Sequence, residues 1–254
     1  MPVHLTLGTH ARRWGVATLP LMLLLTGCVP GIAGVSWQVD EKALAPRELA
    51  QSMTFDFEDI GGSGRMDQTL IVTNTSGVPI LLNADVQALD ASGKGLPDVR
   101  VSGIYGATGG RQVLLPGENV EVLVFGGPNA AKATDVRVTN IKAKGATFPN
   151  VSHHVDATPV DETGTELDDP VIVSAVRVTN ANKATVSVGV VCIVWDRPQA
   201  GEPQQALEVI PLASVVELAA GQESTLRLNP QAQAKIRKFA TSNAISFKAF
   251  FTQG

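Results

Sequence analysis

The sequence has few aromatic residues, little charge and almost no cysteine. Of its 254 residues, 5% are aromatic and 17% are charged, and there are two cysteines. Two cysteines cannot frame a disulfide-rich fold, and their spacing matches no cysteine zinc site. Twenty basic and 24 acidic residues give a formal net charge of −4, with no basic cluster in the sequence. Nucleic acid is therefore not an expected partner, because binding to phosphates needs a basic face.

Long apolar runs are also missing, and the N-terminal one is too short to span a membrane. It covers residues 16–26 and is interrupted by Pro20. As a helix it would extend about 16 Å at ~1.5 Å per residue, against a hydrocarbon core of roughly 30 Å. Arg12 and Arg13 precede it, and no acidic residue occurs before it. A basic start, a short apolar middle and a small-residue end are typical of a secretory signal.

The last four residues of this segment, Leu25-Thr26-Gly27-Cys28, resemble the bacterial lipobox. The resemblance implies cleavage before Cys28 by signal peptidase II and attachment of a diacylglycerol to the Cys28 thiol. The alternative is an ordinary signal with an accidental cysteine nearby. We expect a lipoprotein signal peptide at 1–27, a lipid anchor on Cys28 and a tether at 28–50. The mature chain then carries 18 basic and 24 acidic residues.

An internal repeat organises the rest of the chain. Val72-Thr73-Asn74 recurs as Val178-Thr179-Asn180, 106 positions further on, and Asp90 falls on Asp196 at the same offset. Residues 114–118 match 218–222 at an offset of 104. The matches keep their order, so a duplicated unit of about 100 residues is expected. We therefore predict a first domain at 51–148 and a linker with a second domain at 149–254.

Within each repeat the hydrophobic pattern has period two. Residues 82, 84, 86 and 88 are apolar and alternate with Asn83, Asp85 and Gln87. Val120, Val122 and Val124 alternate with Glu121 and Leu123. A helical period occurs only at 43–51 and 231–240. Short β-branched strands between Gly, Pro and Asn turns predict an all-β protein. We expect two tandem immunoglobulin-like antiparallel β-sandwiches with few short helices.

A valine-rich strand that ends in aspartate and is followed by a Pro-Gly-Glu turn resembles FxLYD-type domains. The matching segments are Val86-Gln87-Ala88-Leu89-Asp90 and Cys192-Ile193-Val194-Trp195-Asp196. FxLYD-type domains are small sandwich modules of exported prokaryotic proteins. The resemblance implies an extracytoplasmic β-module with no catalytic residues to carry over.

Three groups of residues could form a reactive or metal-binding site, and for each a purely structural role is the simpler explanation. Cys192 shares a strand face with valines and is expected in the core. His153, His154 and Asp156 supply at most three metal ligands, with no second cluster, so no metal is expected. The acidic residues between Asp161 and Asp169 lack the ordered spacing of a calcium loop, and a solvated loop is expected.

The glycine-rich segments 61–65 and 106–111 do not predict a phosphate loop. Strands rather than helices follow both, so they are expected to be bends or hairpin loops. No Gly-x-Ser-x-Gly motif and no serine–histidine pair can be assembled. The sequence therefore predicts no catalytic residues, no cofactor and no enzymatic activity.

One strand face differs between the repeats. Where the first repeat has Asn83, Asp85 and Gln87, the second has Val191, Ile193 and Trp195. An exposed apolar face of this size is uncommon on a soluble monomer, so something must cover it. The alternatives are the helical segment 231–240, the first domain, or a partner protein with Trp195 as the anchor.

Taken together, the sequence predicts a lipid-anchored membrane protein that faces outside the cytoplasm. Its expected role is a non-enzymatic structural or protein-interaction module of the cell envelope, with an envelope protein as partner. The alternatives are a carrier of a small apolar or lipid ligand and, as a third class, an envelope hydrolase.

Overall fold

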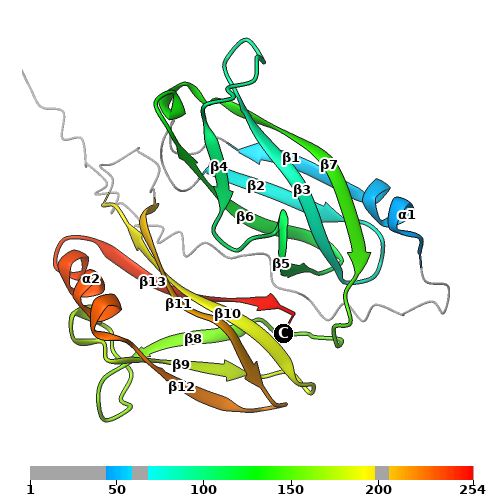
Figure 1. Cartoon of the computed structure of the whole chain (residues 1–254). Helices are drawn as coiled ribbons and strands as arrows, with labels where there is room; N and C mark the ends of the chain where they lie inside the picture. Colours follow the sequence, from blue (N-terminus) through cyan, green and yellow to red (C-terminus); the bar gives the residue numbers. More distant parts are fainter. Residues whose placement is uncertain (1–43, 59–67, 198–205, 254) are drawn as a thin grey trace, which may run out of the picture. The chain divides into compact units, whose positions relative to one another are not determined.

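The computed structural model describes residues 44–58, 68–197 and 206–253, and it is an antiparallel β protein (Figure 1). The strands of the first half are β1 (Met53–Glu58), β2 (Gln68–Asn74), β3 (Ile80–Leu89), β4 (Arg100–Gly103), β5 (Gly109–Leu114), β6 (Gly117–Gly126) and β7 (Asp135–Gly145). Those of the second half are β8 (Val155–Val160), β9 (Ala175–Asn180), β10 (Val186–Trp195), β11 (Ala206–Leu218), β12 (Glu223–Arg227) and β13 (Ala244–Thr252). The all-β class predicted from period two is confirmed.

Short helices connect some of the strands. They are α1 (Pro46–Gln51), α2 (Pro230–Ala240) and two 3-10 turns, η1 (Ala130–Lys132) and η2 (Pro170–Ile172). Helix α2 begins at Pro230, directly after its N-cap residue Asn229. Asn229 Oδ1 accepts a hydrogen bond of 2.8 Å from Ala232 N. Asparagine at the N-cap followed by proline is a strong helix start. Both predicted helical segments are helices.

The strands form a four-stranded sheet, β1-β2-β6-β4, a three-stranded sheet, β12-β9-β8, and a six-stranded sheet, β11-β10-β13-β5-β3-β7. The six-stranded sheet contains strands from both halves, which pair where Thr252 of β13 faces Gln112 of β5. The two halves have a similar strand order: β8-β9-β12 corresponds to β1-β2-β6, and β11-β10-β13 corresponds to β5-β3-β7. The two halves are separated by the segment between the end of β7 at Gly145 and the start of β8 at Val155. That the halves are a duplicated unit stays a prediction.

Each half has its own core between two sheets. In the first half Leu70, Leu82, Leu114 and Leu123 are each 0% exposed and pack in one cluster. The second cluster is built from β9, β10, β11, β13 and α2, and it also takes in Leu81, Val113 and Leu115 from the first half. The outer face of β3 and β5 therefore contributes apolar side chains to the second core.

The period of β6 is as predicted, but its buried face is the one that carries a carboxylate. Glu121 and Leu123 are fully buried, and Phe125 is 6% exposed. Of the valines on the other face, Val122 is 7% exposed and Val120 and Val124 are half-buried. Alternation alone would place the valines inside and Glu121 in solvent. The core of the first half instead includes Leu123 and Phe125, and the Glu121 carboxyl group, which shares their face of β6, is buried with them.

Candidate functional site

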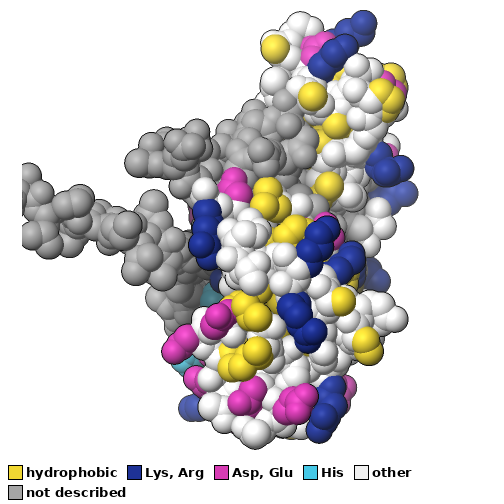
Figure 2. Space-filling model, turned by 90° about the vertical axis from the view of Figure 1, so that its left-hand side faces the viewer, with side chains coloured by type: hydrophobic (Ala, Val, Ile, Leu, Met, Phe, Trp, Pro, Cys, Tyr) yellow, Lys and Arg dark blue, Asp and Glu magenta, His cyan; other side chains and the backbone are white. Residues whose placement is uncertain are grey.

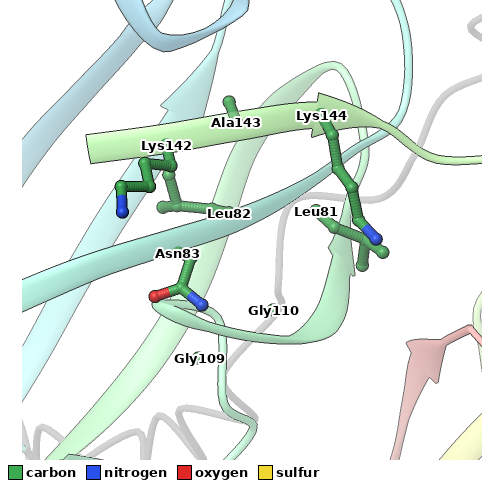
Figure 3. A pocket seen from close by; sticks show the side chains of 8 residues that line it. All are labelled: Leu81, Leu82, Asn83, Gly109, Gly110, Lys142, Ala143 and Lys144. Carbon is green, nitrogen blue, oxygen red and sulfur yellow. The ribbon is translucent and has the colours of Figure 1, made fainter. Parts of the chain in front are cut away.

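The candidate site is an open groove on the outer face of β3 and β7, which we call the lysine groove. It has a volume of about 320 Å³. Its lining residues are Leu81, Leu82, Asn83, Gly109, Gly110, Lys142, Ala143 and Lys144. Figure 3 shows the two lysine side chains leaving β7 and the Asn83 amide turned toward the Gly109–Gly110 segment.

Strand register places the polar groups of the groove together. Lys142 pairs with Asn83 and Lys144 with Leu81. Residues two apart on a strand share a face, and directly paired residues lie side by side across it. The four side chains therefore form a square on one face of the sheet. Ala143 and Leu82 alternate with them and point into the core, at 4% and 0% exposed.

Two irregularities in the strands shape this region. The β3–β5 register shifts between Leu81 and Asn83, and the β3–β7 register shifts between Asn83 and Asp85. Gly110 on β5 has a φ of 70°, a conformation that glycine adopts without steric cost. Breaks in a ladder re-aim the neighbouring side chains, and the groove lies at these breaks.

The β7 irregularity is held by a side-chain hydrogen bond. Asn140 has a φ of 53°, and its Nδ2 donates to Asp85 Oδ2 at 2.5 Å. Left-handed backbone in a non-glycine residue costs energy and persists where the surroundings fix it. Asp85 is thereby partnered by an amide beside the groove, in a second hollow of about 310 Å³ that shares Asn83 and Lys142.

The charges of the groove are unpaired. Ion pairs among the described residues join Arg177 to Glu166 and Lys235 to Glu208. In that part of the chain, Lys142 and Lys144 have no acidic partner, and no acidic residue lines the groove. Figure 2 shows that on one face of the molecule charges of both signs are interspersed with apolar side chains. The groove is therefore locally positive, although the whole chain has a formal net charge of −4.

Glu121 forms a second polar centre, inside the first half. Its Oε1 accepts hydrogen bonds from Tyr105 N at 2.8 Å and Val122 N at 3.0 Å, and its Oε2 accepts one from Ala107 N at 2.6 Å. Burial raises the pKa of Glu121, while the backbone donors oppose the rise. Segment 104–107 thus wraps the carboxyl group of Glu121, a side chain of the same protein.

The predicted partner surface is largely occupied within the chain. Val191 is 4% and Ile193 1% exposed, and both cluster with Phe250 and the half-buried Tyr105 and Trp195. The Tyr105 and Phe250 ring centroids are 5.3 Å apart. Trp195 is the one of the three predicted surface residues that remains half-exposed, and its Nε1 donates to Ser246 Oγ at 2.8 Å. The interaction role of this face stays a prediction.

Helix α2 does not cover that face. Its Ala232 and Ile236 belong to the cluster of Val188 and Cys192, on the opposite side of β10. From the sequence alone, three segments or partners could cover this face. In the structure, Tyr105 of the first half packs against Val191 and Ile193. Phe250, from the neighbouring strand β13, completes the cover, because its ring lies over Gly189, where a Cβ would approach to 2.3 Å.

Cys192 is a core residue, as predicted. It is 0% exposed, and burial raises the pKa of its thiol to about 12. A thiol in this setting is not a nucleophile near neutral pH, because the reactive species is the thiolate.

His153 lies in a bend and His154 directly precedes β8, so neither histidine is on a strand. His153 N and Ser152 N both donate to Asn182 Oδ1, at 3.0 and 2.8 Å. Within the described residues no three His, Cys, Asp or Glu side chains are placed to share a metal ion.

The acidic loop is organised by its own backbone. Asp161 Oδ1 accepts hydrogen bonds from Thr163 N at 2.8 Å and Thr165 N at 2.9 Å, and Asp169 caps η2 through Val171 N. Glu166 pairs with Arg177. These carboxylates shape a turn, as an Asx motif does.

Several sequence predictions lie outside the described residues: the signal peptide 1–27, Cys28, most of the tether and the glycine-rich segment 61–65. Across the described part of the chain, no helix is both long and apolar enough to cross a bilayer.

Sequence reasoning missed both the lysine groove and the buried Glu121. The alternation of Lys142 and Lys144 and the Gly109-Gly110 pair were visible, but only the strand pairing brings them together. Glu121 gave no signal, because its strand reads as an ordinary half-buried one. Comparison of the chain with family models, curated proteins and solved structures finds no match.

Proposed function

We propose that this protein is a bacterial lipoprotein, held at the membrane by a lipid on Cys28, that acts outside the cytoplasm as a non-enzymatic interaction module of the cell envelope. The observation that carries the proposal is the segment Leu25-Thr26-Gly27-Cys28 at the end of a short apolar stretch with a basic start. The FxLYD-like strand segments support the same reading, since modules of that kind occur in exported proteins.

The chain length after Cys28 suits an anchored module. Seventeen residues, 29–45, separate Cys28 from the start of α1. A fully extended chain of this length spans at most about 60 Å, at ~3.3–3.6 Å per residue. Each acyl chain contributes about 0.8 kcal/mol per buried methylene, and the two chains of a diacylglycerol together give the stable anchoring that one chain alone does not.

The fold supports a binding role through its surfaces. Trp195 is half-exposed at the edge of the apolar cluster, and Gln87 is exposed on the matching face of the first half. Tryptophan is enriched among the residues that dominate protein interfaces. We propose that the partner contacts the Trp195 end of this face.

Anchoring is tested by metabolic labelling of cells with an alkyne fatty acid. The wild-type chain and Cys192→Ala should carry the label and sediment with membranes, whereas Cys28→Ala should lose the label and accumulate as the uncleaved precursor. Cys192 is the matched control, because it is the only other cysteine. Labelled Cys28→Ala, or unlabelled wild type, would refute the anchor.

The interaction role is tested by photo-crosslinking in intact cells from positions 195 and 87. A defined envelope protein captured from 195 and not from 87 supports the proposed surface. Crosslinks that run only within the chain from both positions contradict it.

A second function, carriage of a small apolar ligand, is favoured by one observation. An open hollow of about 640 Å³ lies between β1 and β7 at the edge of the first half. Its lining is mixed: an apolar part is formed by Phe55, Phe57, Leu70, Val136 and Val138, and a polar part by Asp56, Thr134, Asp135 and Arg137. Native mass spectrometry of protein purified from its host should then show a bound small molecule that Phe57→Ser releases. A mass equal to that of the bare chain would reject carriage.

A further inference from the structure

The lysine groove has a chemical composition that selects the charge of its ligand. Its rim carries two ammonium groups and one carboxamide, and its remaining lining is glycine, alanine and leucine. Each ammonium offers three hydrogen-bond donors and the amide offers two more, while the amide oxygen is the one side-chain acceptor. We propose that the lysine groove is an anion-binding site that takes a phosphate group, either free or as part of a lipid headgroup.

Repulsion between the two lysines supports the proposal. Lys142 and Lys144 lie on the same face of β7, two residues or about 7 Å apart along the strand, and like charges at this separation repel each other. Neither is paired with an acid in the described structure, although acidic residues outnumber basic ones by 24 to 20 in the chain. A bound anion offsets the repulsion between the two lysines. The free energy of binding is therefore more favourable than it would be if each lysine already had an acidic partner.

The cationic side chains of the groove fit a compact phosphate rather than a planar group. Lysine binds phosphate as a point charge, whereas the fork of an arginine is what recognises planar groups in a bidentate manner. No arginine lines the groove. Leu81 shares the face of the two lysines and is 6% exposed, so part of the lining is apolar surface, where the attraction of an anion to the ammonium groups is less screened.

The register breaks hold the site open. The Asn140–Asp85 hydrogen bond keeps the Asp85 carboxylate on an amide donor instead of on Lys142. Asn83 is exposed, and its side-chain amide has no partner among the described residues. The lysines and the amide are therefore available to a ligand.

The competing explanation is protection of an edge strand. Strand β7 is the last strand of its sheet, and lysines together with a bulge are a common way to prevent edge-to-edge association. This explanation predicts a change of oligomeric state when the lysines are neutralised, with no anion dependence.

The test uses the mature chain from residue 28 onward, with Cys28→Ser in place of the lipid anchor. It compares the parent with Lys142→Gln/Lys144→Gln and with the charge-matched control Lys94→Gln/Lys132→Gln, whose lysines are exposed elsewhere in the first half. One arm titrates inorganic phosphate and follows amide shifts by NMR. The other measures co-sedimentation with vesicles of phosphatidylcholine, with or without phosphatidylglycerol.

We expect shifts centred on Asn83, Gly109 and Lys142–Lys144, and binding at least about tenfold weaker in the groove variant than in the control. Binding to phosphate alone identifies a free phosphate as the ligand, and binding to the anionic vesicles alone identifies a headgroup. Equal binding by the two variants, shifts spread over unrelated lysines, or self-association of the groove variant with unchanged binding would overturn the site. None of these results depends on whether Cys28 is lipidated.

Discussion

The Glu121 carboxylate accepts a 2.8 Å hydrogen bond from the backbone N–H of Tyr105, sixteen residues earlier in the chain. With Ala107 N and Val122 N as further donors, this fixes the bend after β4. The same bend carries the Tyr105 ring, which packs on Phe250 and the Val191–Ile193 face. The buried carboxyl group of Glu121 thereby fixes the loop that carries Tyr105, and Tyr105 packs on the Val191–Ile193 face of the second half.

Removal of this carboxylate should be costly. Glu121→Ala leaves the buried Tyr105, Ala107 and Val122 donors without their acceptor. An unsatisfied buried group costs about 1–3 kcal/mol, so a loss of roughly 3–5 kcal/mol in the free energy of unfolding is expected. Glu118→Ala is the control, because Glu118 is exposed on the same strand. Urea unfolding followed by far-UV circular dichroism measures both variants, and equal stabilities would contradict the role of Glu121.

The protonation of Glu121 should leave a pH signature. Burial raises its pKa above the usual range, so in the window between the unfolded and folded pKa values the folded state binds more protons than the unfolded one. The contribution of this group to stability is greatest below the unfolded pKa of about 4.3 and falls as pH rises through the folded pKa. Carboxyl NMR titration should give a midpoint above that value, and Glu121→Gln should lack this pH dependence. A midpoint below it would show that the backbone donors outweigh burial.

Gly103 has no room for a side chain beside Glu121. A Cβ on Gly103 would lie 2.2 Å from Glu121 Oε2. Gly103→Ala should therefore destabilise the wild type by about 1–3 kcal/mol, as overpacking does, and cost much less in the Glu121→Ala background. A double-mutant cycle of unfolding free energies measures the coupling. Additive effects of the two substitutions would mean that the carboxylate moves away freely.

Two buried asparagines should have matching roles in the two halves. Asn74 Nδ2 donates to Val78 O and Leu114 O, at 2.8 and 3.1 Å. Asn180 Nδ2 donates to Ala184 O and Leu218 O, at 2.9 and 3.1 Å. Each closes a corner between the two sheets of its half.

Asn74→Ala and Asn180→Ala should each cost roughly 2–4 kcal/mol, because each leaves buried carbonyls unpaired. Hydrogen exchange should show the loss confined to the half that carries the substitution. Asn119→Ala serves as a comparison, since Asn119 is half-buried and also bonds to backbone. A small effect at only one of the two corners would argue against their equivalence.

The Cys192 thiol should be unreactive in the folded protein. Its burial and a pKa of about 12 leave almost no accessible thiolate at pH 7. In the unlipidated mature chain, iodoacetamide should modify Cys28 and spare Cys192 until urea unfolds the protein. Mass spectrometry of the peptides distinguishes the two sites. Modification of both under native conditions would show that the second core opens readily.

Much of the fold follows from local sequence. Strand positions, the turns at Gly117 and Gly221 and both helices are specified by short-range patterns: alternation of side-chain polarity, positive φ at glycine, and the Asn229-Pro230 helix start. The burial of Cys192 also follows, because its neighbours at two-residue spacing are valines. These features depend on residues close together in the chain, and so a sequence contains them in readable form.

The packing of the sheets, by contrast, determines which face of a strand is inside and which distant side chains meet there. Alternation gives two faces without naming the one in the core, and on β6 the core cluster of the first half takes Leu123 and Phe125 rather than the valines. The cover of Val191 and Ile193 comes from Tyr105 and Phe250, and the lysine groove from the pairing of β3 with β7. Each depends on contacts between residues far apart in sequence, whose free energy appears only when the sheets have packed.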